Sequence, residues 1–424
     1  MICVRLFAIN GFWDDLVTDR SNYKINQRSD RSPQLEWATG MRSESRNLKT
    51  ACLIEFFGQT SWVSVSLVLP LYTTAVFHAS VVDIGLIMST AFAMAMIFRI
   101  PASLLIGRRG KYVLFAGLAI SAIAPLVYTL AYDVRLVLAV RVLQGLGAAI
   151  LPPIMLSLIS LMSSPRYRGR DIGRYTIAVP MGMIAGSAMT AVVIAAYGMS
   201  ETFTVNTAIG FVALLLALIF LARSDAWAFL KRPTPGNLMP MLTKKPLLGC
   251  FSAFFLFAIL YGAILSFLPL YLTEKFSAPA STVTAVFTAY FVFMAAVRLF
   301  LSRLMVVLDN RTLLMLGFAS AIAAVAVLFL TGDILLVALA FVMLGFCHGI
   351  VYPITAIIVS ETVSPADLAF ANSVLATSFD LGNTVGPITM GLIAESYGIA
   401  FALLSTSLTS LVAILAIHRT LITE

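Results

Sequence analysis

A tetrapeptide that occurs twice constrains this chain more than any other feature. Leu69-Pro70-Leu71-Tyr72 recurs as Leu268-Pro269-Leu270-Tyr271, so the offset between the copies is 268 − 69 = 199 residues. One added residue later makes the offset 345 − 145 = 200. The matched positions include Phe92 with Phe291, Arg99 with Arg298, Ser103 with Ser302, Gly145 with Gly345, Pro153 with Pro353, Gly182 with Gly382 and Gly186 with Gly386. One structural unit is therefore used twice, as in transporters whose two halves are related by an axis along the membrane normal.

The composition indicates that lipid is the main solvent of the chain. Hydrophobic residues make up 60% of the sequence and charged residues only 11%. Apolar runs of about 20 residues cross the hydrocarbon as helices, and each copy contains six of them. We expect spans near 51–77, 81–105, 112–132, 134–162, 172–196, 202–222, 247–273, 280–304, 312–331, 334–360, 368–394 and 399–417. This predicts an all-α integral membrane protein of twelve transmembrane helices, forming two pseudo-symmetric six-helix halves around a central cavity.

The basic residues gather at one end of the predicted bundle. A net charge of +8 is compatible with nucleic-acid binding, but the Lys and Arg residues follow the second and eighth spans and fill the links after the fourth and sixth. This bias predicts a multi-pass protein of the cytoplasmic membrane with both termini cytoplasmic, and no nucleic-acid partner. We expect four segments: a polar, disordered tail 1–48, a first half 49–222, a cytoplasmic linker 223–246 and a second half 247–424. Met41 could equally be the natural start.

Few ionisable residues lie inside the predicted spans. Spans 3, 6, 9 and 12 contain no charged residue, so we expect these helices at the periphery. Away from the ends of the other spans, the ionisable candidates are Glu55, Arg99, Arg141, Arg298, His348 and Asp380.

Asp380, Arg141 and Glu55 are the candidates for proton coupling. Asp380 lies about 18 Å from the start of its span, near the bilayer midplane, where a carboxylate must be protonated, paired or hydrated. Arg141 lies roughly 10 Å inside its span and needs an acidic or carbonyl partner, so a structural clamp is the alternative. Glu55 is about 6 Å from the cytoplasmic end, where an interfacial structural role competes with recognition of a cationic substrate.

Other polar and aromatic residues are candidates for a substrate cavity. Glu55, Gln59, Trp62 and Ser66 follow steps of four, three and four, which places them on one helix face. Tyr261 matches Trp62 in the second copy, and ordinary helix packing is the alternative for both rings. The remaining candidates are Gln144, His348, Tyr352 and Asn383. A lone histidine such as His348 is more often a hydrogen-bonded packing residue than a proton carrier.

The segment Arg141-Val-Leu-Gln144-Gly145-Leu-Gly147 resembles the RxxQGxG signature of the major facilitator superfamily. With the repeat, the resemblance covers nearly all of residues 50–420. In relatives that resemble drug/proton antiporters the signature arginine is implicated in proton coupling, which implies the same role for Arg141. The loop after the second span looks like the superfamily's GxLADRxGRR motif, but Ser103, Gly107 and Gly110 stand at its first glycine, aspartate and second glycine. Without the aspartate the cytoplasmic latch is expected to be weak, which favours an inward-open state.

Two GxxxG pairs occupy equivalent spans, Gly182 with Gly186 and Gly382 with Gly386, and Pro387 follows the second pair. Glycines four apart let helix backbones approach closely, so packing alone explains them. The antiporter signature of the fifth span is similar to GxxxGP, whereas Ser187 replaces its proline here. Arg99, Arg298 and these glycines are therefore assigned to packing and conformational change.

These features predict a secondary active transporter that moves a small molecule by alternating access, with proton-coupled efflux of a drug, sugar or metal-chelating compound as the main hypothesis. A proton-coupled uptake symporter or facilitator remains the alternative, and a channel or sensor ranks lower. We expect no cofactor, no metal and no enzymatic activity, because His78, His348 and His418 are scattered and neither HExxH nor GxSxG occurs. The expected partners are the solute, protons and the bilayer, and we expect a monomer.

Overall fold

The structure, a computed structural model, describes residues 31–104, 109–163, 168–224, 227, 243–364 and 367–421. The chain falls into two units, 1–43 and 44–424, and the second contains the membrane helices. The first helix begins at Arg31, well before the predicted span 51–77 and inside the segment 1–48 for which we expected no ordered structure. Residues 1–30 lie outside the described residues.

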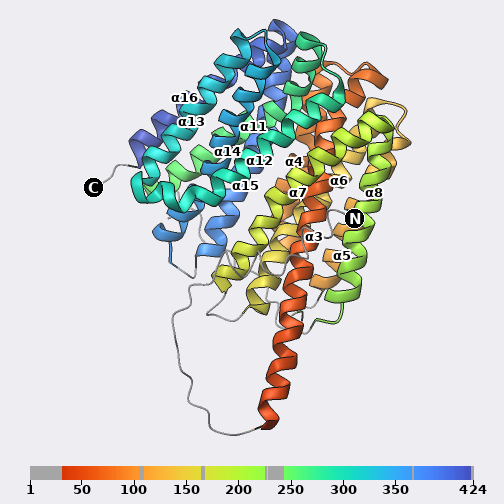
Figure 1. Cartoon of the computed structure of the whole chain (residues 1–424), viewed down its shortest axis with the longest axis vertical. Coiled ribbons are helices and arrows are strands. Elements are labelled where there is room, and N and C mark those ends of the chain that lie inside the picture. The colour runs from red at the N-terminus through yellow and green to blue at the C-terminus, as the bar shows by residue number, and fades with distance from the viewer. Residues whose placement is uncertain are drawn as a thin grey trace. The chain divides into compact units, whose positions relative to one another are not determined.

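Each of the twelve predicted spans coincides with one helix, which confirms the predicted fold class (Figure 1). The first half contains α3 (Arg31–Phe77), α4 (Val81–Leu104), α5 (Gly110–Thr129), α6 (Val134–Met162), α7 (Arg168–Ala196) and α8 (Met199–Leu216), which continues as the π-helical turn η1 (Ala217–Leu221). The second half contains α11 (Lys245–Phe276), α12 (Ala280–Val307), α13 (Asn310–Leu330), α14 (Ile334–Thr362), α15 (Leu368–Tyr397) and α16 (Ile399–Thr420). The boundaries predicted for the linker, 223–246, stay a prediction because most of it lies outside the described residues.

Eleven helices in the described part of the chain are long and apolar enough to cross a membrane, and α15 falls short. Its sequence, LAFANSVLATSFDLGNTVGPITMGLIAESY, carries Asp380 and several Ser, Thr and Asn residues. These groups are tolerated because α15 packs between α4 and α11 instead of facing lipid on all sides. The helix that falls short is therefore one that joins the two halves.

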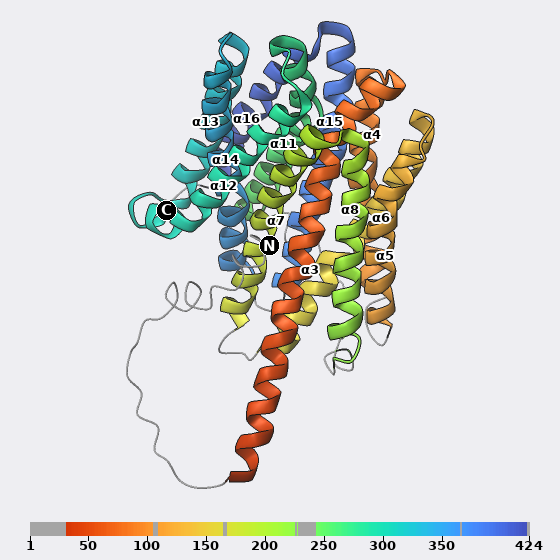
Figure 2. The ribbon, with the colours of Figure 1, turned by 45° about the vertical axis from the view of Figure 1, so that its right-hand side comes forward.

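The halves meet through two helix pairs that are equivalent in the repeat, α4 with α15 and α12 with α7. Figures 1 and 2 show α5, α6 and α8 on one side of these pairs and α13, α14 and α16 on the other. The prediction that every third helix is peripheral holds best for α8 and α16. Of the 18-residue apolar stretch of each helix, 33% and 28% is buried, against 83% for α11. The equivalent helices α5 and α13 are more buried, at 39% and 44%, and each packs mainly against two helices of its own half.

The duplication extends to the backbone of the turns. His78 and Ser277, which are 199 positions apart, both adopt a left-handed conformation with φ of 52° between consecutive helices. Gly198 and Gly398 precede α8 and α16 with φ of 114° and 86°, values that a residue with Cβ rarely adopts. The two copies therefore share turn geometry even where the residue type has changed.

The two ends of the bundle differ in how the halves contact each other. We call the end formed by turns 78–80, 130–133, 197–198, 277–279, 331–333 and 398 the far end, and the opposite one the terminal end. The main apolar cluster of the second half also includes first-half residues from the far-end portions of α3 and α4 and the turn between them, namely Val63, Leu67, Leu71, Ala79, Ile84 and Met88. Near the terminal end, the cluster around Ala51, Ile54 and Ile159 contains first-half residues alone among those described. Apolar packing thus closes the far end.

Candidate functional site between the two halves

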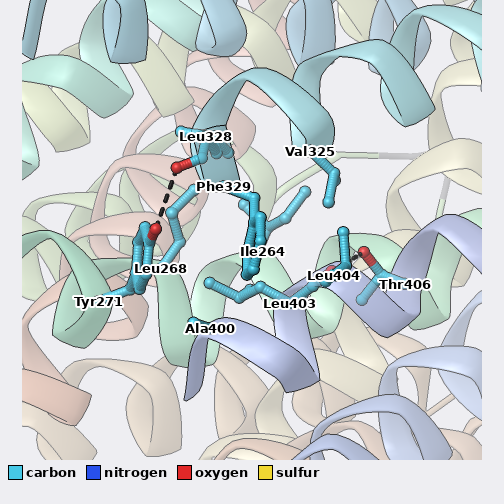
Figure 3. Close-up of a pocket in the computed structure, with 10 residues that line it drawn as sticks. All are labelled: Ile264, Leu268, Tyr271, Val325, Leu328, Phe329, Ala400, Leu403, Leu404 and Thr406. Atoms are coloured by element: carbon cyan, nitrogen blue, oxygen red, sulfur yellow. Dashed lines mark hydrogen bonds between the residues drawn. The ribbon is translucent and has the colours of Figure 1, made fainter. Parts of the chain in front are cut away.

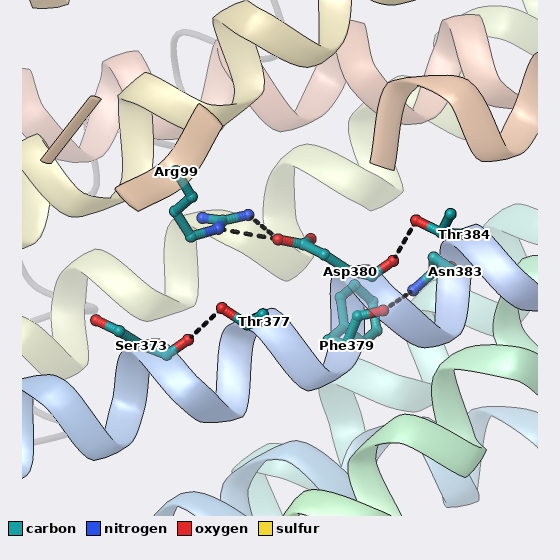
Figure 4. A network of polar contacts seen from close by, with 7 residues as sticks. All are labelled: Arg99, Ser373, Thr377, Phe379, Asp380, Asn383 and Thr384. Carbon is teal, nitrogen blue, oxygen red and sulfur yellow. Dashed lines mark hydrogen bonds and ion pairs between the residues drawn. The ribbon is translucent and has the colours of Figure 1, made fainter. Parts of the chain in front are cut away.

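An ion pair joins the halves at the centre of this interface. Nη2 and Nε of Arg99 on α4 donate hydrogen bonds of 2.6 and 2.9 Å to Oδ2 of Asp380 on α15 (Figure 4). The two side chains are 15% and 5% exposed, so water screens their attraction only slightly. Among the described residues this is the ion pair that crosses between halves. Asp380 and Arg141, which we had grouped together, are therefore not partners.

Glu55 belongs to a polar cluster confined to the first half. Its carboxylate accepts a 2.8 Å hydrogen bond from Nε2 of Gln59, one turn later on α3, and a short one from the hydroxyl of Tyr175 on α7. Glu55 is 3% exposed. Sequence reasoning identified the first two residues from helical spacing but missed Tyr175, because nothing local marks a residue that approaches from another helix.

Arg141 binds backbone instead of a carboxylate. Its Nε donates to the carbonyl oxygen of Ile87 at 2.9 Å, and Nη2 donates to that of Met88 at 3.3 Å, both on α4. Nη1 donates to Oε1 of Gln144 at 2.8 Å, and the Tyr128 hydroxyl donates to the same oxygen at 2.9 Å. Arg141 is fully buried, so these contacts offset the cost of about 2.5–3.5 kcal/mol for an arginine at depth. Gln144 therefore holds Arg141 in place and does not line an open cavity.

A layer of aromatic rings runs from the first half into the second. Trp62 packs edge-on against Phe92 at 5.4 Å and lies under the Arg141 guanidinium at 5.7 Å. Phe92 in turn contacts Phe379 at 6.3 Å, which carries the layer across the interface. Phe379 then contacts three rings of α11, namely those of Phe254, Phe257 and Tyr261. The sequence did not single out Phe379 because it is one of three aromatic residues in a comparatively polar helix.

His348 packs within this layer. Its Nδ1 lies 2.8 Å from the hydroxyl of Tyr290, and its ring is 4.9 Å from Tyr261 and 5.2 Å from Phe257. The residue is 5% exposed. This is the hydrogen-bonded packing role that the sequence left open as the alternative.

Three of the predicted polar residues are either partly exposed or have a buried polar atom without a hydrogen-bond partner. Tyr352 is 40% exposed and lies between the Phe254 ring at 5.6 Å and the Arg298 guanidinium at 5.9 Å. Asn383 donates to the carbonyl oxygen of Phe379 at 3.0 Å, whereas its Oδ1 is buried without a hydrogen-bond partner. The hydroxyl of Ser66 is likewise buried and unpartnered, so Ser66 faces packed helices instead of a cavity.

The glycines of both GxxxG pairs lie at close backbone contacts. A Cβ at Gly182 would come within 2.5 Å of the Phe56 carbonyl oxygen on α3, and one at Gly386 within 2.8 Å of Cα of Ile259 on α11. The other predicted glycines contact neighbours as follows: Gly186 meets Thr60, Gly382 meets Phe255, Gly145 meets Ala91 and Gly147 meets Ser121, while Pro387 meets Gly85. Gly110 is buried at the start of α5, and Gly107 lies outside the described residues.

A small apolar depression lies away from this site, between α11, α13 and α16 near the far end (Figure 3). Its lining includes Ile264, Leu268 and Leu403 and none of the predicted site residues. The described residues contain no cluster of His, Cys, Asp or Glu suited to a metal ion.

Comparison with known proteins places this architecture in a family. A model of the Major Facilitator Superfamily matches residues 51–278 and, a second time, residues 250–423. The chain belongs to the major facilitator superfamily. The two successive matches agree with the internal repeat, and the major facilitator fold explains why the equivalent pairs α4 with α15 and α12 with α7 form the interface between halves.

Its relatives within the superfamily are distant. The chain is 30% identical to an uncharacterized transporter, YebQ, of Escherichia coli over 139 residues, 32% of this chain and 30% of that protein. It is 29% identical to a multidrug resistance protein B homolog of Mycobacterium tuberculosis over 136 residues, 32% of this chain and 25% of that protein. The chain thus matches a third or less of the length of these curated relatives.

Solved structures share the fold at low identity. A bacterial homolog of the human lysosomal transporter Spinster, in an inward-facing and unoccupied conformation, superposes with a TM-score of 0.74 and 17% identity, covering 89% of this chain and 98% of that one. The nucleoside transporter NupG, as a D323A mutant, gives a TM-score of 0.73 at 14% identity over 88% of this chain and 99% of that one. These likenesses show the major facilitator fold.

Proposed function

We propose that this major facilitator protein is a proton-coupled exporter of a small molecule, rather than an enzyme, and that it works as a monomer in the cytoplasmic membrane. The ion pair between Arg99 and Asp380 carries the proposal. It joins helices that must move apart when the site between the two halves changes from facing one side of the membrane to facing the other. Its acidic member can take up a proton, and its basic member cannot lose one.

The charge of Asp380 controls this contact. While Asp380 is ionised, the charge-assisted hydrogen bonds to Arg99 hold α4 against α15. Protonation removes the negative charge and leaves Arg99 free to contact water or solute, so the two halves separate more easily. A proton taken up at Asp380 would thus be exchanged for a solute during the cycle, as an antiporter requires.

The distribution of charge supports a cytoplasmic terminal end. The described residues of that end include Arg109, Lys111, Lys244, Lys245, Arg303, Arg311 and Arg419. Those of the far end include Asp83, Asp133, Glu201, Glu274 and Asp333, with Arg135 and Lys275. Positive residues favour the cytoplasmic side, and the far end is the one closed by apolar packing. On this proposal the apolar packing closes the outer side, which favours an inward-facing arrangement.

The names of the relatives favour export over uptake. One relative is called a multidrug resistance protein B homolog, and another is a methylenomycin A resistance protein of Streptomyces coelicolor, 28% identical over 131 residues. Resistance to a compound is consistent with its removal from the cell. A proton-coupled uptake symporter could use the same ion pair while moving the solute into the cell. The direction of solute transport therefore needs its own measurement.

Inverted membrane vesicles test both coupling and direction. With a proton gradient imposed, addition of a transported solute should release protons from wild-type vesicles and accumulate the solute inside. We expect Asp380→Asn to abolish the proton release while counterflow of labelled solute persists, because exchange needs no net proton movement. Equal proton release by Asp380→Asn and wild type would refute coupling through Asp380. Accumulation only in right-side-out vesicles would refute export.

A further inference from the structure

Comparison of the two copies of the repeat identifies an arginine, Arg298, that lacks the acidic partner of its equivalent. Arg99 and Arg298 are equivalent, since they are 199 positions apart on α4 and α12. The position equivalent to Asp380 in the first half, 200 residues earlier, is Pro180 on α7. The helix pairs α4 with α15 and α12 with α7 form equivalent contacts between the halves. Arg99 therefore meets a carboxylate across the interface, whereas the equivalent position on the helix packed against α12 is the buried Pro180.

Arg298 has no internal partner for its charge. Its Nε is buried without a hydrogen-bond partner, and within the described chain Arg298 makes neither a hydrogen bond nor an ion pair. Its guanidinium lies 5.9 Å from the ring centroid of Tyr352, which is 40% exposed. A buried donor left unpaired is destabilising, and more so when it is charged. Such a cost is unusual in a packed interface unless another group satisfies the donor at some stage of the cycle.

The surrounding charges favour an anion at this position. The carboxylate of Glu55 interacts electrostatically with Tyr352, but it already accepts hydrogen bonds from Gln59 and Tyr175. The charged side chains of the candidate site are Glu55, Asp380, Arg99, Arg141 and Arg298. Three are basic and two acidic, and the carboxylate that pairs with Arg99 is already occupied. One positive charge is thus left for a ligand.

The neighbours of Arg298 also define the rest of the ligand. The Tyr352 ring adjoins Phe254 at 5.6 Å, and Phe254 stacks on Phe379 at 4.9 Å. Aromatic rings bind flat apolar groups through their faces, and a guanidinium binds carboxylate, phosphate or sulfonate through its paired donors. We propose that Arg298, with the rings of Tyr352 and Phe254, binds the anionic group of an amphipathic organic anion that carries an aromatic or alicyclic ring.

This inference rests on the proposed function, because the anion is taken to be the transported solute. It differs from the alternative that Glu55 recognises a cationic substrate. The carboxylate of Glu55 is already satisfied by its own half, whereas the guanidinium of Arg298 is not.

Thermal unfolding of the purified full-length protein provides the test, with naphthoate, naphthyl phosphate and naphthalene sulfonate as anionic probes and neutral naphthamide as the matched compound. We expect at least one anion to raise the unfolding temperature in a saturable manner and naphthamide to have no such effect. Which anion binds best identifies the preferred charged group. The absence of any anion-dependent shift, or an equal shift with naphthamide, would overturn the proposal.

Variants assign the binding to Arg298. Arg298→Gln should weaken anion binding at least tenfold, and Arg298→Lys should weaken it less because the charge remains. Pro180→Asp offers a second route, because it restores the carboxylate that the repeat lacks and should displace the anion without removing Arg298. Arg303→Gln, farther along α12 with its guanidinium over Phe300, is the matched control and should bind as wild type does. Wild-type binding by both Arg298→Gln and Pro180→Asp would overturn the assignment.

Counterflow in proteoliposomes separates this proposal from the proposed function. Binding that depends on Arg298, combined with no counterflow of the bound anion, would support the anion site but refute transport. Counterflow of a neutral or cationic solute that is unaffected by Arg298→Gln would support transport but overturn the anion site.

Discussion

Arg99 on α4 donates two hydrogen bonds to a single carboxylate oxygen of Asp380 on α15, although 281 positions separate the residues in the chain. The contact crosses between two halves that each fold as a six-helix unit. It lies away from the apolar packing of the far end, where Gly85 of α4 approaches Pro387 of α15. One interface therefore combines a close apolar contact with a polar contact that a proton can break.

Exchange of the two charges should restore what each single reversal removes. Arg99→Asp or Asp380→Arg leaves two like charges in a largely buried site, and each should destabilise the protein by about 3 kcal/mol or more. The double variant Arg99→Asp with Asp380→Arg restores an ion pair, with the acidic residue on α4 and the basic residue on α15. A double-mutant cycle from chemical unfolding in detergent measures the coupling energy. Additive effects of the two reversals would show that the pair contributes nothing.

Arg141 should not tolerate replacement by lysine. An ammonium group cannot reach the carbonyl oxygens of Ile87 and Met88 and the side chain of Gln144 from one position, because it lacks the planar fork of the guanidinium. We expect Arg141→Lys to lower stability by about 2 kcal/mol, since each lost bond leaves a buried group unpaired. Thermal unfolding measures the change, with Arg135→Lys at the exposed start of α6 as control. Equal stability of Arg141→Lys and wild type would contradict the clamp.

Gly186 and Gly173 provide a matched pair on α7. A Cβ at Gly186 would overlap the backbone of Thr60 on α3, whereas one at Gly173 would meet nothing within 4 Å. Gly186→Ala should therefore destabilise the protein by about 1–3 kcal/mol through overpacking. Gly173→Ala should leave stability unchanged or raise it by up to about 1 kcal/mol, because alanine favours the helix. Similar effects of both changes on the unfolding midpoint would contradict the close contact.

Asp309 should stabilise the start of α13 in a pH-dependent manner. The pKa of this exposed carboxyl is held below its usual value, chiefly by hydrogen bonding with the Thr312 side chain. The backbone N–H of Thr312, which donates to Oδ2 at 3.3 Å, lowers the pKa further. A lowered pKa in the folded state means that the stabilisation is fully present above the unfolded pKa of about 3.9 and is lost as the pH falls through the folded pKa. Asp309→Asn keeps the cap without a titrating group.

Hydrogen exchange of the first turn of α13 measures this effect. At neutral pH, Asp309→Ala should speed exchange of these amides about fivefold, the equivalent of about 1 kcal/mol for a lost cap. The wild-type protein should lose the same protection on acidification, after correction for the intrinsic pH dependence of exchange, whereas Asp309→Asn should not. Identical pH profiles for wild type and Asp309→Asn would show that the carboxylate is not the stabilising group.

The candidate site could be predicted only in part, and particular residues show why. Gln59 and Glu55 share a helix face, so local spacing was enough to group them, and their hydrogen bond follows from that spacing. Arg141 was expected to need an acidic or carbonyl partner, but only the packing of α4 against α6 decides between the two. Phe379 carries the aromatic layer between halves, and nothing in its neighbourhood along the chain distinguishes it from a lipid-facing ring.

By itself, the sequence determined the twelve helices, the duplication and the superfamily, because hydrophobic length, repeat offset and the Arg141 to Gly147 signature are all readable along the chain. The tertiary structure alone decided which charges are paired. The repeat makes Arg99 and Arg298 equivalent, yet among the described residues Arg99 meets a carboxylate and Arg298 does not. Side chains hundreds of residues apart are brought together by helix packing between the halves, and local periodicity carries no information about those distances.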